Sequence, residues 1–411
     1  MKLLQVDTLT EAEAKLMNCF KQRPVEVETI SLENALGKIL AIDVTSKGDI
    51  PSFYRSSVDG YAVRSSDTAG ASESVPVLLT IIEEVAIGSE AQKTVESGQC
   101  TYVPTGGMVP KGADAMVMVE YCEPFGSHQT AVYESVPFGK AVVVPGEDIK
   151  AGQCLLSGGT KLGPAHIGAL AASGVTRVPV FRCWRTAVIS TGDELIPSDC
   201  RPVRGQVRDI NTWALTAAAE AAGFQVVMRR VLPDREEIIR RTVEEAMSSC
   251  DLVLISGGSS QGKKDLTCDI LNTVSDGGVF THGLALKPGK PTILGFDTQT
   301  GTLLAGLPGH PVAALIVFNL LIARLWKKMT GQKETFGTEA FMDCGLASDP
   351  GKTTCILVHL APSEGVLTAY PILGKSGLIT TMTAADGYIL VDMNQEGVKK
   401  GERVTVYPLE S

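Results

Sequence analysis

The stretch Asp251–Thr267 reads DLVLISGGSSQGKKDLT and passes from an apolar run through a glycine- and serine-rich loop into helix-forming residues. The run DLVLIS predicts a buried strand, and CDILNTV after the loop predicts a helix. Backbone N–H groups in such a turn bind anions, so Gly257, Gly258 and Ser259 are candidate phosphate ligands. A carboxylate, Asp265, nevertheless ends the same loop, and the ligand must therefore suit both an anion-binding turn and a carboxylate.

Two familiar nucleotide-binding loops do not fit this stretch. Gly257, Gly262 and Lys263 match the first seven positions of a Walker A loop, but Lys264 stands where Ser or Thr would hold magnesium. The spacing is not G-x-G-x-x-G either, which argues against a dinucleotide fingerprint. A plain strand-to-helix connection remains the alternative for this loop.

A regular alternation of strands and helices surrounds the loop from Arg185 onward. Such alternation is typical of βαβ units and predicts an α/β domain with a mostly parallel sheet over residues 181–330. The predicted strands are TAVIS, QVVMRRV, DLVLIS, PTILGF and TLLAGL, and the predicted helices are TWALTAAAEAA, REEIIRRTVEEAM, LTCDILNTV and PVAALIVFNLLIARLW.

The flanking regions differ in composition, and 411 residues are too many for a single core. Residues 70–145 are rich in Val, Gly and Pro with short alternating runs, which predicts a small all-β module. Residues 331–411 contain similar runs, such as TTCILVHL and ERVTVYP, and predict a separate β-domain. Near the N-terminus, Thr10 and Glu13 have the spacing of a capping box and predict the start of a short helix.

Charge and composition exclude several classes of protein. The net charge of −9 argues against a nucleic-acid-binding protein, which usually has a basic face. The longest apolar stretch, Val312–Ala323, is too short to span a membrane, and the first residues do not have the pattern of a signal peptide. The 10 cysteines form no C-x-x-C pair, so we expect reduced thiols in the cytoplasm rather than zinc or disulfides.

Charged or glycine-rich segments follow the predicted strands of the central domain. Ligands of such sheets bind at the carboxyl ends of the strands, so these segments are expected to meet at one edge. Each has a simpler alternative, because Asp193 and Asp234 are also suited to capping helices and the lysines to solvated surface. The segments are Thr191–Glu194, Pro233–Asp234, the loop that ends at Asp265, the stretch with Lys287 and Lys290, and Pro308–Pro311.

Carboxylates beside phosphate-binding turns suit a metal ion that bridges the two groups. Mg²⁺ prefers oxygen ligands and is commonly held by one or two carboxylates together with phosphate oxygens. The expected ligand is therefore a phosphate ester or pyrophosphate, with the metal neutralising charge as a P–O bond breaks.

Seven motifs follow one another along the chain: PSFYRSSVDGYAV (Pro51–Val63), VPTGGMVPKGADAMVMVE (Val103–Glu120), GEDIKAG (Gly146–Gly152), STGDEL (Ser190–Leu195), SGGSSQGKKD (Ser256–Asp265), KPGKP (Lys287–Pro291) and GLPGHPVAA (Gly306–Ala314). In this order and spacing they resemble the MoeA family of molybdopterin molybdotransferases, which includes the gephyrin E domain. The resemblance covers nearly all 411 residues.

The resemblance implies that the protein inserts molybdate into adenylylated molybdopterin, with Mg²⁺, and releases AMP and molybdenum cofactor. It implies an elongated N-terminal region over residues 1–180 with a β-module inserted at about 50–145, a central MogA-like α/β domain over 181–330, and a C-terminal β-barrel over 331–411. It also implies a homodimer in which the N-terminal region of one subunit faces the central domain of the other. A MogA-like adenylyltransferase and molybdoenzymes are the implied protein partners.

The resemblance also implies roles for individual residues. An aspartate before Gly-Tyr, such as Asp59, is by itself equally typical of a turn. The implied catalytic residues are Asp59, Asp148, Glu194 and Asp265; the implied metal ligands are Asp234, Asp265 and Glu194; and the implied substrate-binding residues are Thr105, Gly257, Gly258, Ser259, Lys287, Lys290, Pro308, His310, Pro311 and Ser376.

Departures from the family pattern concentrate among the residues that the resemblance places near the molybdate oxyanion. His310 and Ala313 stand where the family usually has Asn and Ser, and Lys352 is the nearest match for an arginine of the C-terminal domain. Tungstate resembles molybdate in size and charge, so a tungstate-inserting paralogue is one alternative function. A non-catalytic module that holds molybdopterin or finished cofactor is another, and a structural scaffold is a third.

Overall fold

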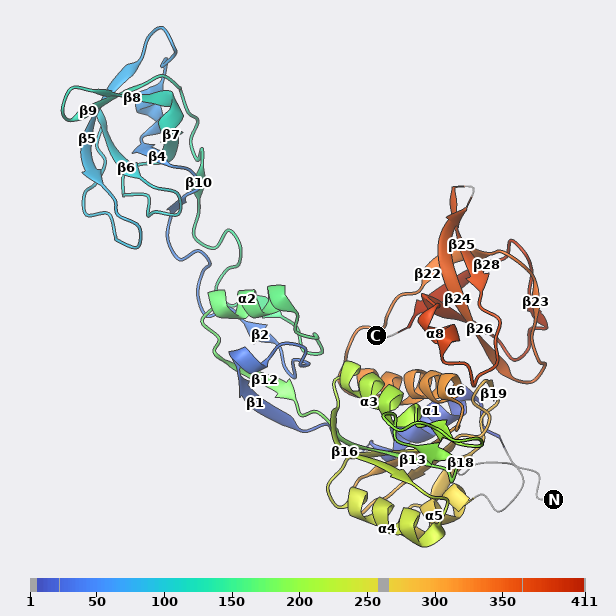
Figure 1. Ribbon diagram of the computed structural model, residues 1–411. Coiled ribbons are helices and arrows are strands. Elements are labelled where there is room, and N and C mark those ends of the chain that lie inside the picture. The colour runs from blue at the N-terminus through green and yellow to red at the C-terminus, as the bar shows by residue number, and fades with distance from the viewer. Residues whose placement is uncertain (1–5, 22, 258–265, 364, 410–411) are drawn as a thin grey trace.

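A computed structural model describes residues 6–21, 23–257, 266–363 and 365–409 of the chain. Figure 1 shows an extended molecule in which a β-module and a narrow connecting region form an arm that leads to a central α/β domain and a C-terminal β-domain. Among the described residues, each helix is too short or too polar to cross a membrane.

The central domain is built on a six-stranded sheet with the order β16-β13-β17-β21-β20-β18. The first four strands are parallel, and β20 and β18 run antiparallel at one edge. This arrangement confirms the predicted α/β domain with a mostly parallel sheet. The strands are β13 (Arg185–Thr191), β16 (Gln225–Leu232), β17 (Leu252–Ser256), β18 (Val279–His282), β20 (Ile293–Phe296) and β21 (Leu303–Leu307).

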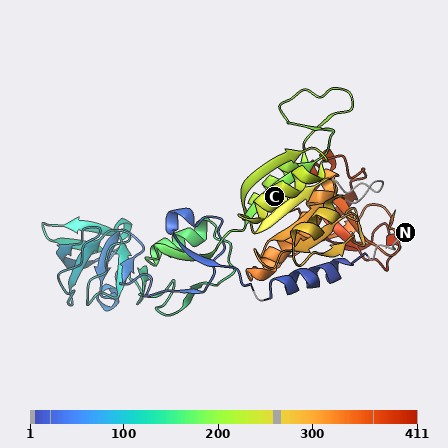
Figure 2. The same ribbon diagram turned by 90° about the horizontal axis from the view of Figure 1, so that it is seen from below.

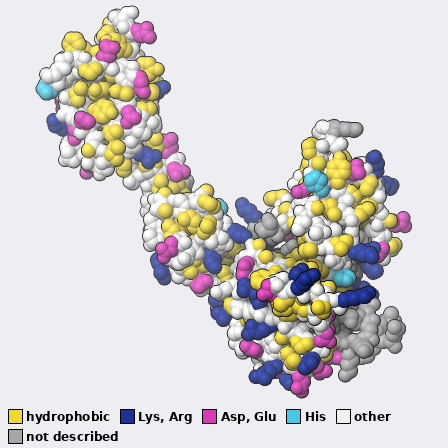
Figure 3. All heavy atoms as spheres, viewed as in Figure 1, with side chains coloured by type: hydrophobic (Ala, Val, Ile, Leu, Met, Phe, Trp, Pro, Cys, Tyr) yellow, Lys and Arg dark blue, Asp and Glu magenta, His cyan; other side chains and the backbone are white. Residues whose placement is uncertain are grey.

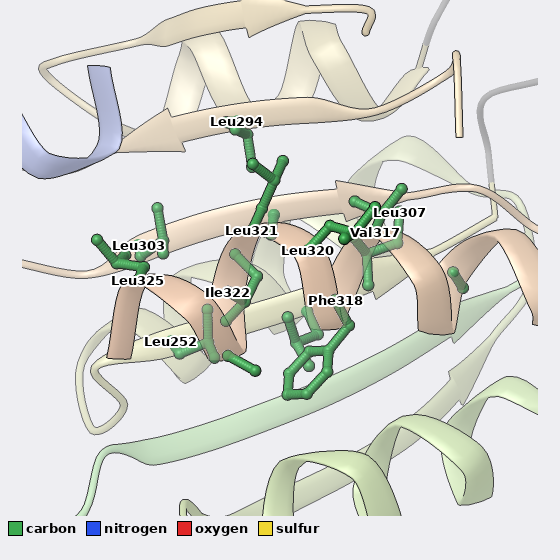
Figure 4. Close-up of a cluster of buried hydrophobic side chains, with 14 of the residues drawn as sticks. Leu252, Leu294, Leu303, Leu307, Val317, Phe318, Leu320, Leu321, Ile322 and Leu325 are labelled. Atoms are coloured by element: carbon green, nitrogen blue, oxygen red, sulfur yellow. The ribbon is translucent and has the colours of Figure 1, made fainter. Parts of the chain in front are cut away.

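Helices cover both faces of this sheet because alternate residues of the buried strands point to opposite faces. Leu252 and Leu254 pack against α3 (Asn211–Ala221) and the continuous helical segment α6 (Pro311–Val317), η4 (Phe318–Ala323) and α7 (Arg324–Met329), whose side chains are drawn in Figure 4. Val253 and Ile255 pack on the other face against α4 (Glu236–Met247) and α5 (Leu266–Val274). The two cores hold the carboxyl ends of the strands in fixed positions.

Helix α1 (Leu9–Cys19) lies along the central domain although it comes first in the chain (Figure 2). Its buried residues join the same core as α6 and η4. The predicted capping box at Thr10 is wrong, because the helix begins two residues earlier and Thr8 and Glu11 form the box. Glu13 instead forms ion pairs with Arg324 at 3.4 Å and Lys328 at 2.6 Å on α7. Both threonines have the motif spacing, and packing of the helix selects between them.

The arm begins with β1 (Val27–Ser31), which pairs with the returning strand β12 (Arg177–Phe181). Farther out, β2 (Val44–Thr45) pairs with β11 (Cys154–Leu156), and α2 (Pro164–Ala172) covers them. The β-module has a six-stranded sheet in the order β7-β4-β6-β5-β9-β8. Its strands are β4 (Gly60–Val63), β5 (Val77–Glu84), β6 (Gln99–Val103), β7 (Ala115–Met118), β8 (Cys122–Phe125) and β9 (Gln129–Val132), and β3 (Arg55–Ser56) pairs with β10 (Val142–Val143) at its base.

The C-terminal domain is a closed β-barrel, as predicted. Strands β24, β25, β22, β28 and β26 pair in turn, and β24 also pairs with β26, which closes the ring. Strand β19 (Leu286–Lys287) of the central domain pairs with β24 and joins the two domains. The barrel strands are β22 (Thr338–Met342), β24 (Thr353–Ser363), β25 (Val366–Pro371), β26 (Gly387–Val391) and β28 (Arg403–Pro408).

Candidate functional site

A cleft of about 650 Å³ opens at the carboxyl ends of the parallel strands. This is the edge at which the sequence predicted that charged and glycine-rich segments would meet. Six of the predicted site residues line it, and they come from four different strand ends: Glu194, Asp234, Gly257, Pro308, His310 and Pro311. We call this space the sheet-edge cleft.

Carboxylates dominate one wall of the sheet-edge cleft. The Asp234 backbone N–H donates to Oδ1 of Asp193 at 3.1 Å, which holds the two strand ends together. Burial raises the pKa of Asp234, and the neighbouring charges of Asp193 and Glu194 raise it further. A cation placed here would relieve this repulsion. Neither aspartate caps α4 through its side chain, because the N-cap residue is Arg235 and it makes no such bond.

Glycine turns form the floor of the cleft. Gly257 has a φ of +109°, and an added Cβ would lie 2.1 Å from the carbonyl oxygen of Thr191. Any other residue would therefore push β17 away from β13 at this point. Gly309 lies against it, since a Cβ on Gly309 would be 3.8 Å from the Gly257 Cα. Gly258, Ser259 and Asp265 lie outside the described residues.

A second cleft of about 730 Å³ lies between the central domain and the barrel, and we call it the interdomain cleft. Lys287 and Lys290 line it, together with Lys352 and Lys375 from the C-terminal domain. Lys287 forms an ion pair of 2.9 Å with Asp349, and this lysine holds the pKa of Asp349 below its usual value. Asp349 was missed in the sequence because it is adjacent to Lys287 only after the domains pack.

The two clefts meet at Pro291, Pro308 and His310, which line both. His310 Nδ1 lies 2.8 Å from the hydroxyl oxygen of Ser376, a residue of the C-terminal domain. The Ser376 carbonyl also accepts the Val312 N–H at 3.2 Å. His310 is the N-cap residue of α6, but its side chain makes no capping bond. The His310 side chain therefore does not cap the helix.

Three of the predicted residues lie on the arm and line neither cleft within this chain: Asp59, Thr105 and Asp148. Asp59 Oδ1 accepts the Thr105 N–H at 2.8 Å, so these two residues form one local unit of the β-module. The Asp148 N–H donates to the Ile50 carbonyl at the base of the module. Figure 1 shows this module at the far end of the arm from the central domain.

Sequence reasoning also missed residues at the start of α3 and directly before it. Arg208, Asp209 and Asn211 line the sheet-edge cleft, and Asn211 donates to the Gly309 carbonyl at 2.8 Å. Their stretch, RDIN, follows no long strand and contains no glycine, so it gave no strand-end signal. Among the described residues there is no group of three or more His, Cys, Asp or Glu side chains that could hold a metal ion.

Comparisons with known proteins cover almost the whole chain. Residues 7–174 match the family described as the MoeA N-terminal region (domain I and II), residues 187–328 match a probable molybdopterin binding domain, and residues 339–409 match the MoeA C-terminal region (domain IV). A molybdopterin molybdenumtransferase of Haemophilus influenzae is 30% identical, with 98% of each protein covered. A molybdopterin molybdenumtransferase of Staphylococcus epidermidis is 32% identical, with 94% of this chain and 93% of that protein covered.

Solved structures agree with these sequence matches. Two crystal structures of the molybdopterin biosynthesis MoeA protein from Pyrococcus horikoshii each have a TM-score of 0.80 to this chain, at 33% and 30% identity. Each match covers 98% of this chain and nearly all of the other. The matches extend over nearly the full length of the chain and include all of its domains in the same order. The chain therefore belongs to the MoeA family.

Proposed function

We propose that this protein is a molybdopterin molybdotransferase that inserts molybdate into adenylylated molybdopterin and releases AMP. The observation that carries this proposal is the meeting of two chemically different clefts at Pro308 and His310. One cleft offers glycine turns and carboxylates, and the other offers lysines. A substrate with an adenylate at one end and a metal-accepting dithiolene at the other needs both environments side by side. The names of the relatives, molybdopterin molybdenumtransferase, support the same reaction.

On the adenylate side, the turns at Gly257 and Gly309 bind the phosphate through backbone N–H groups. Glu194 and Asp234 lie beside these turns and suit a divalent cation: burial raises the pKa of Asp234, the charges of Asp193 and Glu194 raise it further, and a cation would offset both effects. We assign them as ligands of Mg²⁺, with Asp265 as a third ligand that lies outside the described residues. When bound, Mg²⁺ supplies positive charge that stabilises the phosphate oxygens as the P–O bond breaks.

On the oxyanion side, Lys287 and Lys290 supply positive charge for molybdate, and Lys352 takes the place of the usual arginine. His310 and Ser376 supply neutral or charged donors at the boundary between the clefts. The side chain at position 313 is an alanine, so it contributes no hydroxyl. Molybdate and tungstate have the same charge and nearly the same size, so this donor set suits either oxyanion, and tungstate stays an alternative substrate.

We further propose that the protein works as a homodimer in the cytoplasm. Asp59, Thr105 and Asp148 then reach the clefts of the second copy, because they line neither cleft of their own chain. Charge supports this arrangement: residues 55–143 carry 11 acidic and 5 basic side chains, whereas residues 181–330 carry 15 acidic and 17 basic ones. None of the 10 cysteines, all of them described, forms a disulfide, which suits a reducing compartment. A MogA-like adenylyltransferase would supply the substrate, and molybdoenzymes would take the product.

The direct test is to mix the purified protein with adenylylated molybdopterin, Mg²⁺ and either molybdate or tungstate, and to measure AMP. We expect AMP release that depends on both the oxyanion and Mg²⁺. Asp234→Asn should reduce the rate by about 10²–10³-fold, because one charge is lost where the reaction needs it. Asp265→Asn should do the same. Tight binding of the pterin without AMP release by the wild-type protein would instead identify a non-catalytic binding module.

A further inference from the structure

Asn211 is the first residue of α3 and is only 8% exposed, although it lines the sheet-edge cleft. Its amide nitrogen donates to two acceptors, the hydroxyl of Ser256 and, at 2.8 Å, the carbonyl of Gly309. Ser256 is the last residue of β17, directly before Gly257, and Gly309 belongs to the turn after β21. One side chain therefore bridges the two glycine turns.

This bridge acts where the sheet no longer can. Strands β17 and β21 are paired from Leu252↔Leu303 to Ser256↔Leu307, and the ladder ends there. From there on, side chains connect the two segments: the Ser256 hydroxyl donates weakly to the Pro308 carbonyl at 3.4 Å, and Asn211 reaches one residue farther, to Gly309. A planar amide has two N–H donors at a fixed angle, so asparagine can bind two acceptors and set the distance between them. Aspartate and leucine cannot do this, and serine has a single donor.

The bond to Gly309 also orients the next peptide. Cis peptide bonds occur among the described residues at Ile50–Pro51 and Lys287–Pro288, and the Gly309–His310 bond is trans. In a trans peptide the C=O and N–H groups point in opposite directions. The Gly309 carbonyl points to Asn211, so the His310 N–H points away from it. Within the described chain this N–H has no backbone acceptor, and His310 lines the cleft.

The amide oxygen of Asn211 indicates that a contribution to stability alone does not explain why an asparagine occupies this position. Its oxygen Oδ1 is buried and has no hydrogen-bond partner among the described residues. A buried acceptor without a donor destabilises a fold, and such groups in native proteins call for an explanation. The N–H groups of the same amide connect the end of β17 to the turn at Gly309, and this connection explains why the unpaired oxygen is tolerated.

We propose that Asn211 is a positioning residue that holds the end of β17, at Ser256 and Gly257, and the turn at Gly309 at the spacing that binds the adenylyl phosphate. The inference rests on the proposed function, because that function identifies the ligand of the turns as an adenylate. Asn211 does not touch the reacting atoms; it acts through the two turns. Its effect must therefore depend on whether a ligand carries a phosphate group.

The test compares the affinities of AMP and adenosine, measured by calorimetry and by competition, in the wild-type protein and in Asn211→Asp and Asn211→Leu. Both variants are close in size to asparagine and lack the two donors. We expect AMP affinity to fall at least about tenfold, since donors to a charged phosphate are misplaced. Adenosine affinity should change by less than about twofold, because adenosine does not use the turns. If neither variant folds, Asn211→Ser, which keeps one donor, should show an intermediate loss for AMP alone.

Thr212→Val is the matched control. Thr212 is also buried in the first turn of α3 and donates to the Ser190 hydroxyl at 2.8 Å, but it does not contact either glycine turn. It should lower thermal stability to a similar extent and leave the ratio of AMP to adenosine affinity unchanged. The proposal is overturned if the Asn211 variants lose both ligands equally, if they lose neither, or if Thr212→Val shows the same selective loss. The AMP-release assay on the wild-type protein tests the proposed function separately, and the affinity ratio tests Asn211 whatever its result.

Discussion

At the residue scale, His310 is the polar side chain at the boundary between the two clefts. Of the three residues that line both clefts it is the one with a hydrogen-bonding side chain, and it shares a 2.8 Å contact with Ser376 across the domain boundary. The imidazole therefore occupies the place at which an oxyanion and the pterin would meet. The His310 side chain contacts the barrel residue Ser376, whose carbonyl also accepts the Val312 N–H of the first turn of α6.

We expect His310→Ala to raise the KM for molybdate or tungstate by about tenfold, the loss of one donor to a charged group. Binding of the adenylylated pterin should change little, and His310→Asn, which restores the usual family residue, should keep much of the activity. The measurements are AMP release against oxyanion concentration and equilibrium binding of the pterin. His359→Ala is the control, since His359 pairs with Asp386 at 2.6 Å on the barrel, away from both clefts. An equal loss of pterin binding and oxyanion use in His310→Ala would return His310 to a packing role.

At the element scale, the connection between β12 and β13 links the base of the arm to the central domain through Arg182. Arg182 in this connection donates to both carboxylate oxygens of Asp251, at 3.0 and 2.8 Å, and to Glu26 at 2.6 Å. Asp251 also accepts the Arg185 N–H at 2.7 Å. The hydrogen bonds to Asp251 raise the pKa of Arg182 above its ordinary value, so the guanidinium stays charged. The start of β17 and both strands at the base of the arm are thereby tied to one side chain.

We expect Arg182→Met to lower the free energy of unfolding by roughly 1–3 kcal/mol, because a partly buried carboxylate loses its bidentate partner. The arm should also sample more directions, which small-angle scattering would detect as a broader distribution of interatomic distances. Arg240→Met is the control: Arg240 forms an exposed i,i+4 pair with Glu244, worth less than about 0.5 kcal/mol, and lies far from the arm. Identical scattering from Arg182→Met and the wild-type protein would show that the arm is held by other contacts.

At the scale of the whole molecule, charge is distributed unevenly. The β-module has a net charge of −6 from its 11 acidic and 5 basic side chains, while the central domain, with 17 basic and 15 acidic side chains, has +2. Figure 3 shows lysine and arginine side chains gathered over the central domain on the face in view. Opposite charges on separated domains would favour contact between copies rather than within one copy, since the β-module lies far from the central domain of its own chain in Figure 1.

The proposed dimer predicts complementation between inactive variants. Asp59→Ala and Glu194→Ala should each be inactive alone, because every site then lacks one of the two residues. After subunit exchange, about a quarter of the wild-type activity should return: half of the dimers are mixed, and each mixed dimer has one intact site of two. AMP release from the exchanged mixture is the measurement, with mass spectrometry to confirm exchange. Absence of recovery in a confirmed mixture would mean that both residues serve the same chain's site.

The sequence by itself determined five of the six sheet strands of the central domain, all but β18, and the edge at which its charged and glycine-rich segments meet. Alternation of strands and helices is a local pattern, and the strand DLVLIS is buried on both faces as such an apolar run requires. Because parallel strands end at one edge, Glu194, Asp234, Gly257 and Pro308 were expected to meet, and they line one cleft. The roles of these residues stay predictions until activity is measured.

Tertiary structure decided the features that depend on contacts between distant segments. Asn211 and Gly309 are 98 residues apart, and His310 and Ser376 are 66 residues apart, so no local period connects them. The pair of Lys287 and Asp349 exists only because the barrel packs against the central domain. Even the start of α1 followed this rule, since Thr8 and Thr10 have the same motif spacing and only the packing of the helix against α7 distinguishes them. Local sequence specifies which segments form strands, helices and turns, whereas side chains from separate segments become neighbours only when burial of the cores brings those segments together.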